Sequence, residues 1–457
     1  MPLQKNQVLT LRVERLSSDG SGVAHSPDGE TVFIPGAAPG DEARVRIVKD
    51  CKRYAFGILD EVLTPSPDRI PVDCAVAGPC GGCSLRHLDY AAELRAKQEN
   101  VADAFARIGG LDVPVLPIVG SPEVNRYRNK VQFPVGVDKS GKPCIGFYAG
   151  RTHRIVPCPD CRLQPGVLNE IGNALCAFFA EKGIQPYSEE TGRGLVRHIF
   201  LRRGAHSGQI MVCLVCTRAK LPSAEELCTR LKAQFAEITT ILLNVNAKNT
   251  NVILGTETHT LYGQGYIEDT LCGVPVQLGP LSFYQVNTLA AEQLYGIAAQ
   301  YAQLTPDDLL LDLYCGMGTI GLSMAAHCRE LIGVEIVPEA IESAKANAAR
   351  MGADVAAKSR FFCADAGQAA TRLAAEGLHP DIVMLDPPRK GCDEATLSAV
   401  VRMSPRRVVY VSCNPSTAAR DAAWLGQHGY RAEKVQPVDL FPRTKHCEVV
   451  SCYTKTM

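Results

Sequence analysis

The chain has 457 residues, of which 46% are apolar, and its 48 Lys and Arg balance its 48 Asp and Glu. This length is too great for one compact core, so we expect two to four domains. The zero formal charge argues against a protein that holds nucleic acid by its overall field, so any such contact must be local. Neither a secretory pattern nor a bilayer-spanning apolar run is present, which predicts a cytoplasmic protein without membrane association.

Residues 8 to 63 have the pattern of about five short strands separated by turns, among them Ser26-Pro27-Asp28-Gly29. This predicts a small OB-like barrel, an architecture that often binds oligonucleotides. Lys52, Arg53 and Tyr54 place charge and an aromatic ring on one connection, as in proteins that track single strands. A solvated loop on a packing module is the alternative interpretation.

Cysteines follow the proline-rich linker from Pro65 to Pro71. Nineteen cysteines without a secretory signal favour thiols and metal ligands over disulfides. Cys74, Cys80 and Cys83 are spaced so that three thiolates could converge, and a closed site needs a fourth ligand. The candidates for that ligand are Cys158 and Cys161. Thiolate ligation suits an iron–sulfur cluster or a structural zinc, and the spacing does not separate them.

Residues 120 to 270 are predicted to be α+β, with helices near 166–182 and 224–235. Basic residues gather before one predicted strand, at 126–130, and around another, LVRHIFLRR. With a period of two, these side chains could share one sheet face and take RNA phosphates. A solvated strand face is the alternative.

The segment LLLDLYCGMGT, residues 309–319, is predicted to form a buried strand, a glycine turn and the start of a helix. Gly316 and Gly318 let the backbone pass close to a ligand, and the helix start offers free N–H groups. Glu335 ends the next predicted strand, where an acid can reach ribose hydroxyls. The G-x-G-x-x-G spacing also fits a dinucleotide, but Asp312 inside the strand and the later Asp386-Pro387-Pro388-Arg389 favour S-adenosylmethionine.

From residue 309 onward, predicted strands and helices alternate, which indicates a doubly wound α/β sheet. Ligands in such sheets lie beyond the carboxyl ends of the strands, so Asp365, Asp386 and Cys413 should share a rim with Gly316 and Glu335. Upstream, Gln285 in the segment FYQVN is a candidate contact to the donor, although helix capping by Gln285 or Asn287 is an alternative.

Cys413, in YVSCNP, is expected between a strand and a helix, where the helix N-terminus should lower the pKa of its thiol. A thiolate that adds to carbon 6 of a pyrimidine makes carbon 5 able to attack a methyl donor. A base must then remove the proton from carbon 5. Glu448 is the candidate base, if a closing strand brings it to the site. A core cysteine and a surface acid are the alternative interpretations.

The motifs LDLYCGMGT, LDPPRKG, YVSCNP and TKHCE, with the barrel and the C-x5-C-x2-C cluster, resemble the RNA (uracil-5-)-methyltransferase family, specifically its 23S ribosomal RNA branch. The resemblance implies a Rossmann-like α/β methyltransferase domain at 276–457, an N-terminal OB-like TRAM β-barrel at 1–64 and a central α+β RNA-binding domain at 72–275. The central domain would carry a [4Fe-4S] cluster.

The resemblance also implies roles for particular residues. Cys413 is the expected nucleophile and Glu448 the proton acceptor. The expected contacts to S-adenosylmethionine are Gln285, Tyr314, Glu335, Asp365 and Asp386. The expected cluster ligands are Cys74, Cys80, Cys83 and, counted from His153 in the family pattern, Cys161 rather than Cys158.

The resulting expectation is methylation of carbon 5 of a uridine in 23S ribosomal RNA, with S-adenosylmethionine as donor, by a monomer without an obligate protein partner. Because the tRNA-modifying relatives are expected to lack barrel and cluster, both features favour ribosomal RNA. The uridine would have to leave its stack to meet Cys413. The alternatives are the same chemistry on a tRNA uridine or on cytosine, and a noncatalytic RNA-binding assembly factor.

Overall fold

The structure is a computed structural model that describes residues 3–150, 152–248 and 252–456. The chain divides into two compact units, each built from separate stretches of sequence. Unit 1 comprises Met1–Ala77, Gly82–Val124 and Leu385–Met457, and unit 2 comprises Gly78–Gly81 and Asn125–Met384. Within the described residues, no helix is long and apolar enough to cross a membrane.

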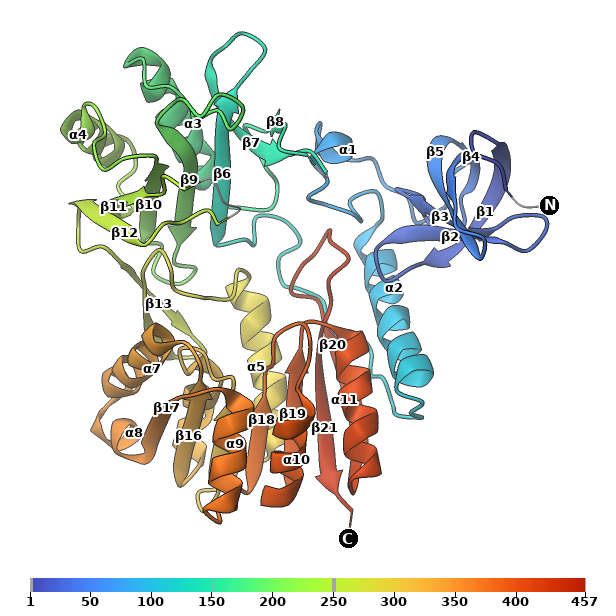
Figure 1. Cartoon of the computed structure of the whole chain (residues 1–457), viewed down its shortest axis with the longest axis vertical. Helices are drawn as coiled ribbons and strands as arrows, with labels where there is room; N and C mark the ends of the chain where they lie inside the picture. The colour runs from blue at the N-terminus through green and yellow to red at the C-terminus, as the bar shows by residue number, and fades with distance from the viewer. Residues whose placement is uncertain (1–2, 151, 249–251, 457) are drawn as a thin grey trace. The chain divides into compact units, whose positions relative to one another are not determined.

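Unit 1 begins with a closed barrel whose strand order is β1-β2-β3-β5-β4 (Figure 1). The strands are β1 (Val8–Leu16), β2 (Ser21–His25), β3 (Thr31–Pro35), β4 (Glu42–Asp50) and β5 (Tyr54–Thr64). Alternate residues of β4, Ala43, Val45 and Ile47, are fully buried in the barrel core. A Cβ at Gly57 would lie 2.3 Å from Val45 Cγ1, so only glycine fits there. The predicted OB-like barrel is confirmed.

Helices and strands from two further stretches of the chain, Gly82–Val124 and Leu385–Met457, complete unit 1. The elements are α2 (Tyr90–Asp103) with the π-helical turn η1 (Ala104–Ile108), α10 (Glu394–Met403), β19 (Arg407–Ser412), α11 (Pro415–Gln427), β20 (Tyr430–Val438) and β21 (Glu448–Lys455). Asp89 caps α2 by accepting a hydrogen bond from Ala92 N at 2.7 Å. Helix α11 packs against η1 and against β20 and β21 (Figure 1). Strand β21 pairs antiparallel with both β19 and β20.

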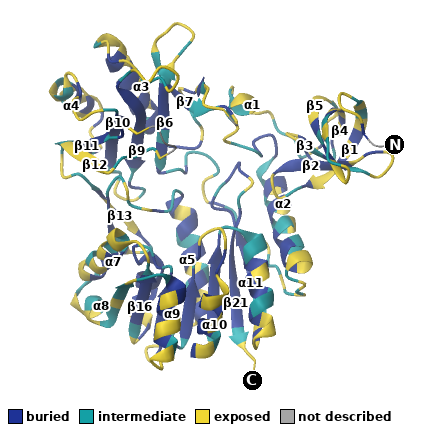
Figure 2. Cartoon of the chain, viewed as in Figure 1, coloured by how far each residue is buried: buried dark blue, intermediate teal, exposed yellow. Residues whose placement is uncertain are grey.

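Unit 2 contains a seven-stranded sheet of order β12-β11-β10-β9-β6-β7-β8. Its elements are β6 (Lys130–Val137), β7 (Pro143–Tyr148), β8 (Ile155–Pro157), α3 (Gly166–Glu181), β9 (Val196–Arg203), β10 (Ile210–Cys216), α4 (Ala224–Gln234), β11 (Ile238–Val245) and β12 (Glu257–Tyr262). The apolar faces of α3 and α4 share one core with this sheet, and β10 is buried along its whole length (Figure 2). Both predicted helices of this region are confirmed.

The predicted basic face on β9 is wrong. Arg197 and Arg202 are 6% and 1% exposed. Arg197 Nη1 donates to the carbonyls of Asn246 and Lys248, whereas both terminal nitrogens of Arg202 donate to carbonyls of the segment 279–282. These guanidiniums hold the unit together and do not offer a surface to phosphates.

The α/β sheet has the strand order β17-β16-β15-β18-β19-β21-β20. The remaining elements are α1 (Ala77–Cys80), β13 (Ile267–Leu271), β14 (Val274–Leu278), α5 (Thr288–Ala302), β15 (Leu309–Leu313), α6 (Thr319–Met324), η2 (Ala325–His327), β16 (Glu330–Glu335), α7 (Pro338–Met351), α8 (Ala353–Lys358), β17 (Ser359–Cys363), α9 (Ala366–Ala375) and β18 (Ile382–Leu385). Strand β16 pairs parallel with both β15 and β17, as the alternating pattern predicted.

Candidate active site

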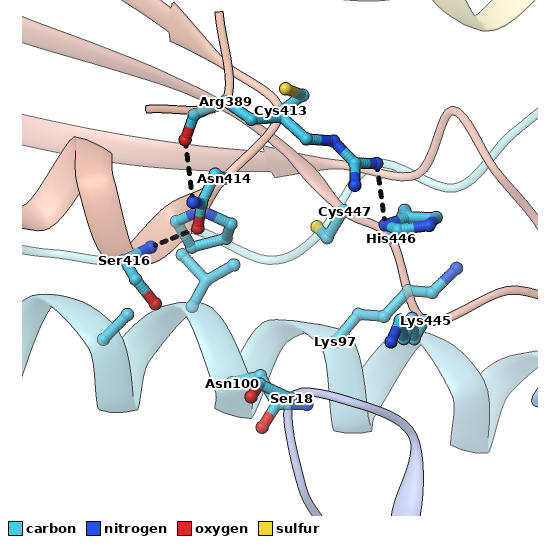
Figure 3. A pocket seen from close by; sticks show the side chains of 13 residues that line it. Ser18, Lys97, Asn100, Arg389, Cys413, Asn414, Ser416, Lys445, His446 and Cys447 are labelled. Atoms are coloured by element: carbon cyan, nitrogen blue, oxygen red, sulfur yellow. Dashed lines mark hydrogen bonds between the residues drawn. The ribbon is translucent and has the colours of Figure 1, made fainter. Parts of the chain in front are cut away.

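Cys413 lies in unit 1 at the point where β19 ends and α11 begins. Asn414 is the N-cap residue of α11, and its Oδ1 accepts a hydrogen bond from Ser416 N at 3.1 Å. Its Nδ2 donates to the carbonyl of Arg389 at 3.0 Å (Figure 3). Thr417 Oγ1 donates to the same carbonyl at 3.3 Å. One asparagine therefore caps the helix and ties the DPPR segment to the loop that carries the thiol.

Glu448 reaches the same end of the sheet through antiparallel pairing. Ser412, the last residue of β19, pairs with Val449 of β21. Cys413 follows directly after β19, and Glu448 is the first residue of β21, so both lie next to this pair. Glu448 is only 6% exposed, so the carboxyl group is largely withdrawn from water. The predicted closing strand is β21, and it brings the acid to the thiol.

The charges at this point act on one another. Burial and, to a smaller extent, the charge of Asp386 raise the pKa of Glu448 to about 8, although Arg389 opposes them. Burial also raises the pKa of Asp386 to about 7. Arg389 Nη2 donates to His446 Nδ1 at 3.3 Å (Figure 3). Two carboxyl groups and one guanidinium therefore surround the thiol.

The expectation of a lowered thiol pKa is wrong for this structure. Burial raises the pKa of Cys413, and the Glu448 carboxylate raises it further. The Arg389 guanidinium opposes these effects by its charge and by a hydrogen bond to the sulfur, but it does not overcome them. In addition, Cys413 precedes the N-cap residue, so it lies outside the first turn of α11, where the helix dipole acts most strongly.

Unit 2 holds the glycine turn between β15 and α6. Gly316 and Gly318 have φ angles of 56° and 79°, and Tyr314 also has a positive φ, of 66°. A Cβ on Gly316 would meet nothing within 4 Å, whereas one on Gly318 would lie 3.2 Å from Ala344 Cβ. The first glycine therefore leaves space in which a ligand can approach the backbone, and the second is required by packing.

Glu335 ends β16 beside this turn. Its Oε2 accepts a hydrogen bond from Gly316 N at 3.2 Å, and its Oε1 accepts from Ile336 N and Val337 N at 2.8 and 3.0 Å. The structure therefore brings Glu335 to the glycine turn, as the sequence predicted. Asp365, the other acid expected in this unit, caps α9 by accepting from Gln368 N at 3.1 Å.

Two residues bind the backbone of the FYQVN segment and of the residues just before it. The sequence did not predict this structural role for either of them. Asn129 Nδ2 donates to the carbonyl of Gln285 at 2.7 Å and to Thr288 Oγ1 at 2.9 Å. Arg202 binds the carbonyls of Gly279 and Ser282 just upstream. Asn287 caps α5, as one of the alternatives anticipated. Only the clustering of Arg and Asn in RYRNK and HIFLRR marked these residues, and it was interpreted as RNA contact.

The expected cluster ligands are divided between the units: Cys74 and Cys83 belong to unit 1, and Cys80 and Cys161 to unit 2. All four are half-buried, whereas Cys158 is 3% exposed. Among the described residues, no three or more His, Cys, Asp or Glu side chains form a group that could hold a metal ion. Arg86 donates hydrogen bonds to Cys83 and, at 2.6 Å, to Asp73. A guanidinium beside a sulfur suits a thiolate ligand.

Comparison with known proteins identifies the chain. The family model described as tRNA (Uracil-5-)-methyltransferase matches residues 205–455, more than half of its length. The chain belongs to this family. The methyltransferase also matches the TRAM domain model over residues 2–59, which is the barrel. Its chemistry is S-adenosylmethionine-dependent methylation of carbon 5 of uracil in RNA.

The alignments with its relatives cover nearly the whole chain. The methyltransferase is 43% identical over 451 residues to an uncharacterized RNA methyltransferase of Halalkalibacterium halodurans, covering 98% of this chain and 97% of the relative. It is 40% identical over 454 residues to one of Clostridium tetani, covering 99% and 98%. Among solved structures, it resembles the Pyrococcus abyssi tRNA (uracil-54, C5)-methyltransferase bound to S-adenosyl-L-homocysteine. That match has a TM-score of 0.78 and 26% identity, covering 98% of this chain and 100% of that one.

The last comparison corrects one step of the sequence argument. A tRNA methyltransferase that covers 98% of this chain must match most of the barrel as well as the catalytic domain. The barrel therefore does not separate ribosomal RNA enzymes from tRNA enzymes, and the inference drawn from its presence was wrong.

Proposed function

We propose that this methyltransferase acts on a uridine of 23S ribosomal RNA through a covalent adduct between Cys413 and carbon 6 of the base. The observation that carries the proposal is the pairing of Ser412 with Val449, because it brings a cysteine and a buried carboxyl group to the same end of two strands. Nucleophilic activation of a pyrimidine needs these two groups together. The motifs that resemble the 23S branch support the substrate.

The reaction begins when the Cys413 thiol gives its proton to solvent, and Arg389 favours the resulting thiolate. The sulfur then bonds to carbon 6 while the electron pair of the C5=C6 bond moves toward O4. Carbon 5 of this enolate takes the methyl group of S-adenosylmethionine, and S-adenosylhomocysteine leaves. Glu448, as carboxylate, takes the proton from carbon 5. The C5=C6 bond re-forms, and the sulfur departs with the electrons of the C6–S bond.

Glu448 suits the proton transfer because its pKa is raised. A carboxylate whose conjugate acid has a pKa of about 8 is a stronger base than an ordinary glutamate, and its pKa lies near the operating pH. Asp386, with a pKa raised to about 7, neighbours Glu448 and Cys413. We therefore propose that Asp386 contacts the edge of the uracil ring as well as the methyl donor.

The donor contacts are proposed at Gln285, Tyr314, Glu335 and Asp365. Support comes from the open space at Gly316 and from the Glu335 carboxylate beside it, which suits ribose hydroxyls. Asn129 binds the backbone carbonyl of Gln285. The side chain of Gln285 can therefore contact the donor. Asp365 has a second role as a helix cap, so its contact to the donor is the least supported of the four.

The [4Fe-4S] cluster is proposed on Cys74, Cys80, Cys83 and Cys161. Four thiols suit such a cluster, which would supply a covalent tie between segments that are distant in the chain. None of the reaction steps above passes through it. Anaerobically purified protein should be brown and absorb at about 400 nm as iron–sulfur proteins do, whereas a zinc site would be colourless.

A tRNA uridine is the second candidate substrate, favoured by the likeness to the Pyrococcus abyssi enzyme. The test is to incubate the protein with labelled S-adenosylmethionine and either unmodified 23S rRNA or unmodified tRNA, followed by nucleoside analysis. Label in 5-methyluridine from 23S rRNA alone supports the proposal, and label from tRNA alone replaces the substrate. RNA binding without label from either RNA would identify a noncatalytic factor instead.

A further inference from the structure

A pocket of about 250 Å³ lies beside Cys413, lined only by residues of unit 1. Its walls come from the turn after β1, from α2, from the DPPR segment, from the start of α11 and from the loop before β21 (Figure 3). The reaction described above uses Cys413 and Arg389 but leaves the rest of this pocket without a role. Because the pocket includes the reactive thiol, whatever occupies it lies next to the target base.

The polar part of the pocket lining consists of cations and neutral groups, and Val101, Ala104 and Pro415 form its apolar part. Arg389, Lys97 and Lys445 are among its lining residues, together with His446, and the lining contains no Asp or Glu. Lys97 is engaged, since its Nζ donates to Glu93 and Asp439 at 2.8 Å each. Arg389 and Lys445 are exposed. Arg389 contacts His446 and the Cys413 sulfur, and its exposed guanidinium also faces the pocket. Such a lining suits an anion that also carries hydroxyl groups.

The charged groups next to the pocket are consistent with binding of an anion. Lys445 acts electrostatically on Asp19, which lies in the turn after β1 and outside the pocket lining. Asp19 is already engaged by Ser17 and by Ser21 N, the latter at 3.1 Å. Ser18, between them, lines the pocket and is exposed. In this turn, the Asp19 carboxylate therefore binds groups of the turn itself, and Ser18 lines the pocket.

The walls of the pocket are fixed to one another. Arg15 of β1 pairs with Asp103 of α2 at 2.5 Å, and Asn100 Nδ2 donates to the carbonyl of Ser17 at 3.4 Å. A Cβ at Gly20 would lie 3.4 Å from Lys445 Cβ, so the barrel turn approaches the loop before β21 closely. The pocket is thus a built feature in which barrel, α2 and catalytic loop each contribute one wall.

We propose that this pocket binds a phosphodiester group of the RNA strand next to the target uridine, with Lys445 and Arg389 as its cations and Ser18 as a hydrogen-bond donor. The inference rests on the proposed function, because the phosphate belongs to the strand that delivers the uridine to Cys413. It gives the barrel a specific task at the active site. The turn after β1 would help to fix which nucleotide lies beside the thiol.

The test is RNA binding by Lys445→Gln in the full-length protein, with Lys345→Gln on α7 as the charge-matched control. Lys345 is exposed, pairs only locally with Glu342, and does not line the pocket. The probe is a 23S rRNA stem-loop that contains the target uridine, mapped by analysis of labelled RNA fragments. Loss of one phosphate contact should make the negative slope of log K against log salt shallower by about 0.7 to 0.9. The control should keep the wild-type slope.

The position of the phosphate is found with stem-loops that carry one neutral methylphosphonate at a time. Wild-type protein should lose affinity at one linkage next to the uridine, and Lys445→Gln should lose nothing further at that linkage. Equal losses for both proteins at every linkage, or an unchanged salt slope, would overturn the subsite while methylation continued. Absence of methylation by the wild type would instead count against the proposed function. Competition by inorganic phosphate alone, without any linkage effect, would identify a free-anion site and overturn the RNA assignment.

Discussion

Replacement of Lys97 by methionine should destabilise unit 1 strongly. Lys97 Nζ lies 2.8 Å from both Glu93 Oε1 and Asp439 Oδ1, and no more than 2% of any of these side chains is exposed. The substitution keeps the length of the side chain and removes its charge. Two buried carboxyl groups then lose their shared cation. Loss of one partner from a buried ion pair costs about 3–5 kcal/mol of the free energy of unfolding.

The structure places the expected cost at the lower end of that range. Glu93 keeps the backbone N–H of Arg443 at 2.7 Å and the Arg443 guanidinium at 3.5 Å. Asp439 keeps the hydroxyl of Tyr90 at 2.9 Å. Because neither carboxyl group is left without a donor, we expect a loss of about 3 kcal/mol.

The chain contains a single tryptophan, Trp424, which makes the assay specific for unit 1. It lies on α11, half-buried, with its ring stacked on His428 at 3.7 Å. Its fluorescence during urea unfolding therefore follows the unit that contains Lys97. The control is Arg95→Met on the same helix, since Arg95 is 57% exposed and pairs with Asp68. We expect the control to lose at most about 1 kcal/mol. Equal unfolding midpoints for the two variants would refute the reasoning.

Three further outcomes are expected. Glu448→Gln should accumulate a methylated RNA adduct on Cys413, visible as a retarded band on a denaturing gel, with release slowed about 10²–10⁴-fold; release at the wild-type rate would exclude Glu448 as the base. The reaction requires unprotonated Glu448, whose pKa is about 8, and unprotonated Cys413, whose pKa is raised, so kcat/KM should rise with pH. Arg389 lowers both pKa values, so Arg389→Gln should move this rise to higher pH. An unmoved pH profile would argue against this role of Arg389. Cys80→Ser should lower the iron content after anaerobic purification, and unchanged iron would remove Cys80 from the ligand set.

Local sequence rules predicted the elements of the α/β region because each rule acts within a few residues. Helix α7 (Pro338–Met351) is one of the helices in the predicted alternation, and Pro338 stands in its first turn. Asp393 and Asn414 cap α10 and α11 through their side chains. The strand pattern likewise marked β15 and β16, whose residues are almost entirely buried.

Contacts between distant segments could not be predicted in this way. The basic pattern of LVRHIFLRR predicted contacts to phosphates, yet the guanidiniums of Arg197 and Arg202 bind carbonyls some 50 and 80 residues later in the chain. A buried arginine is stable when its donors are satisfied, and the sequence does not reveal the acceptors. In the same way, the register of β19 with β21 is what joins Glu448 to Cys413, although a long segment containing β20 separates them in the chain.

The thiol pKa shows why the chemistry of a site needs its geometry. A helix start raised the expectation of an acidic thiol, but burial and two neighbouring carboxyl groups act in the opposite direction, and Arg389 is the cation that opposes them. Arg389 also lines the adjoining pocket. A phosphate that bound there through Arg389 alone would offset its positive field at Cys413 and raise the thiol pKa still further. A second cation is therefore needed if RNA binding is not to suppress the nucleophile, and Lys445 is in place to supply it.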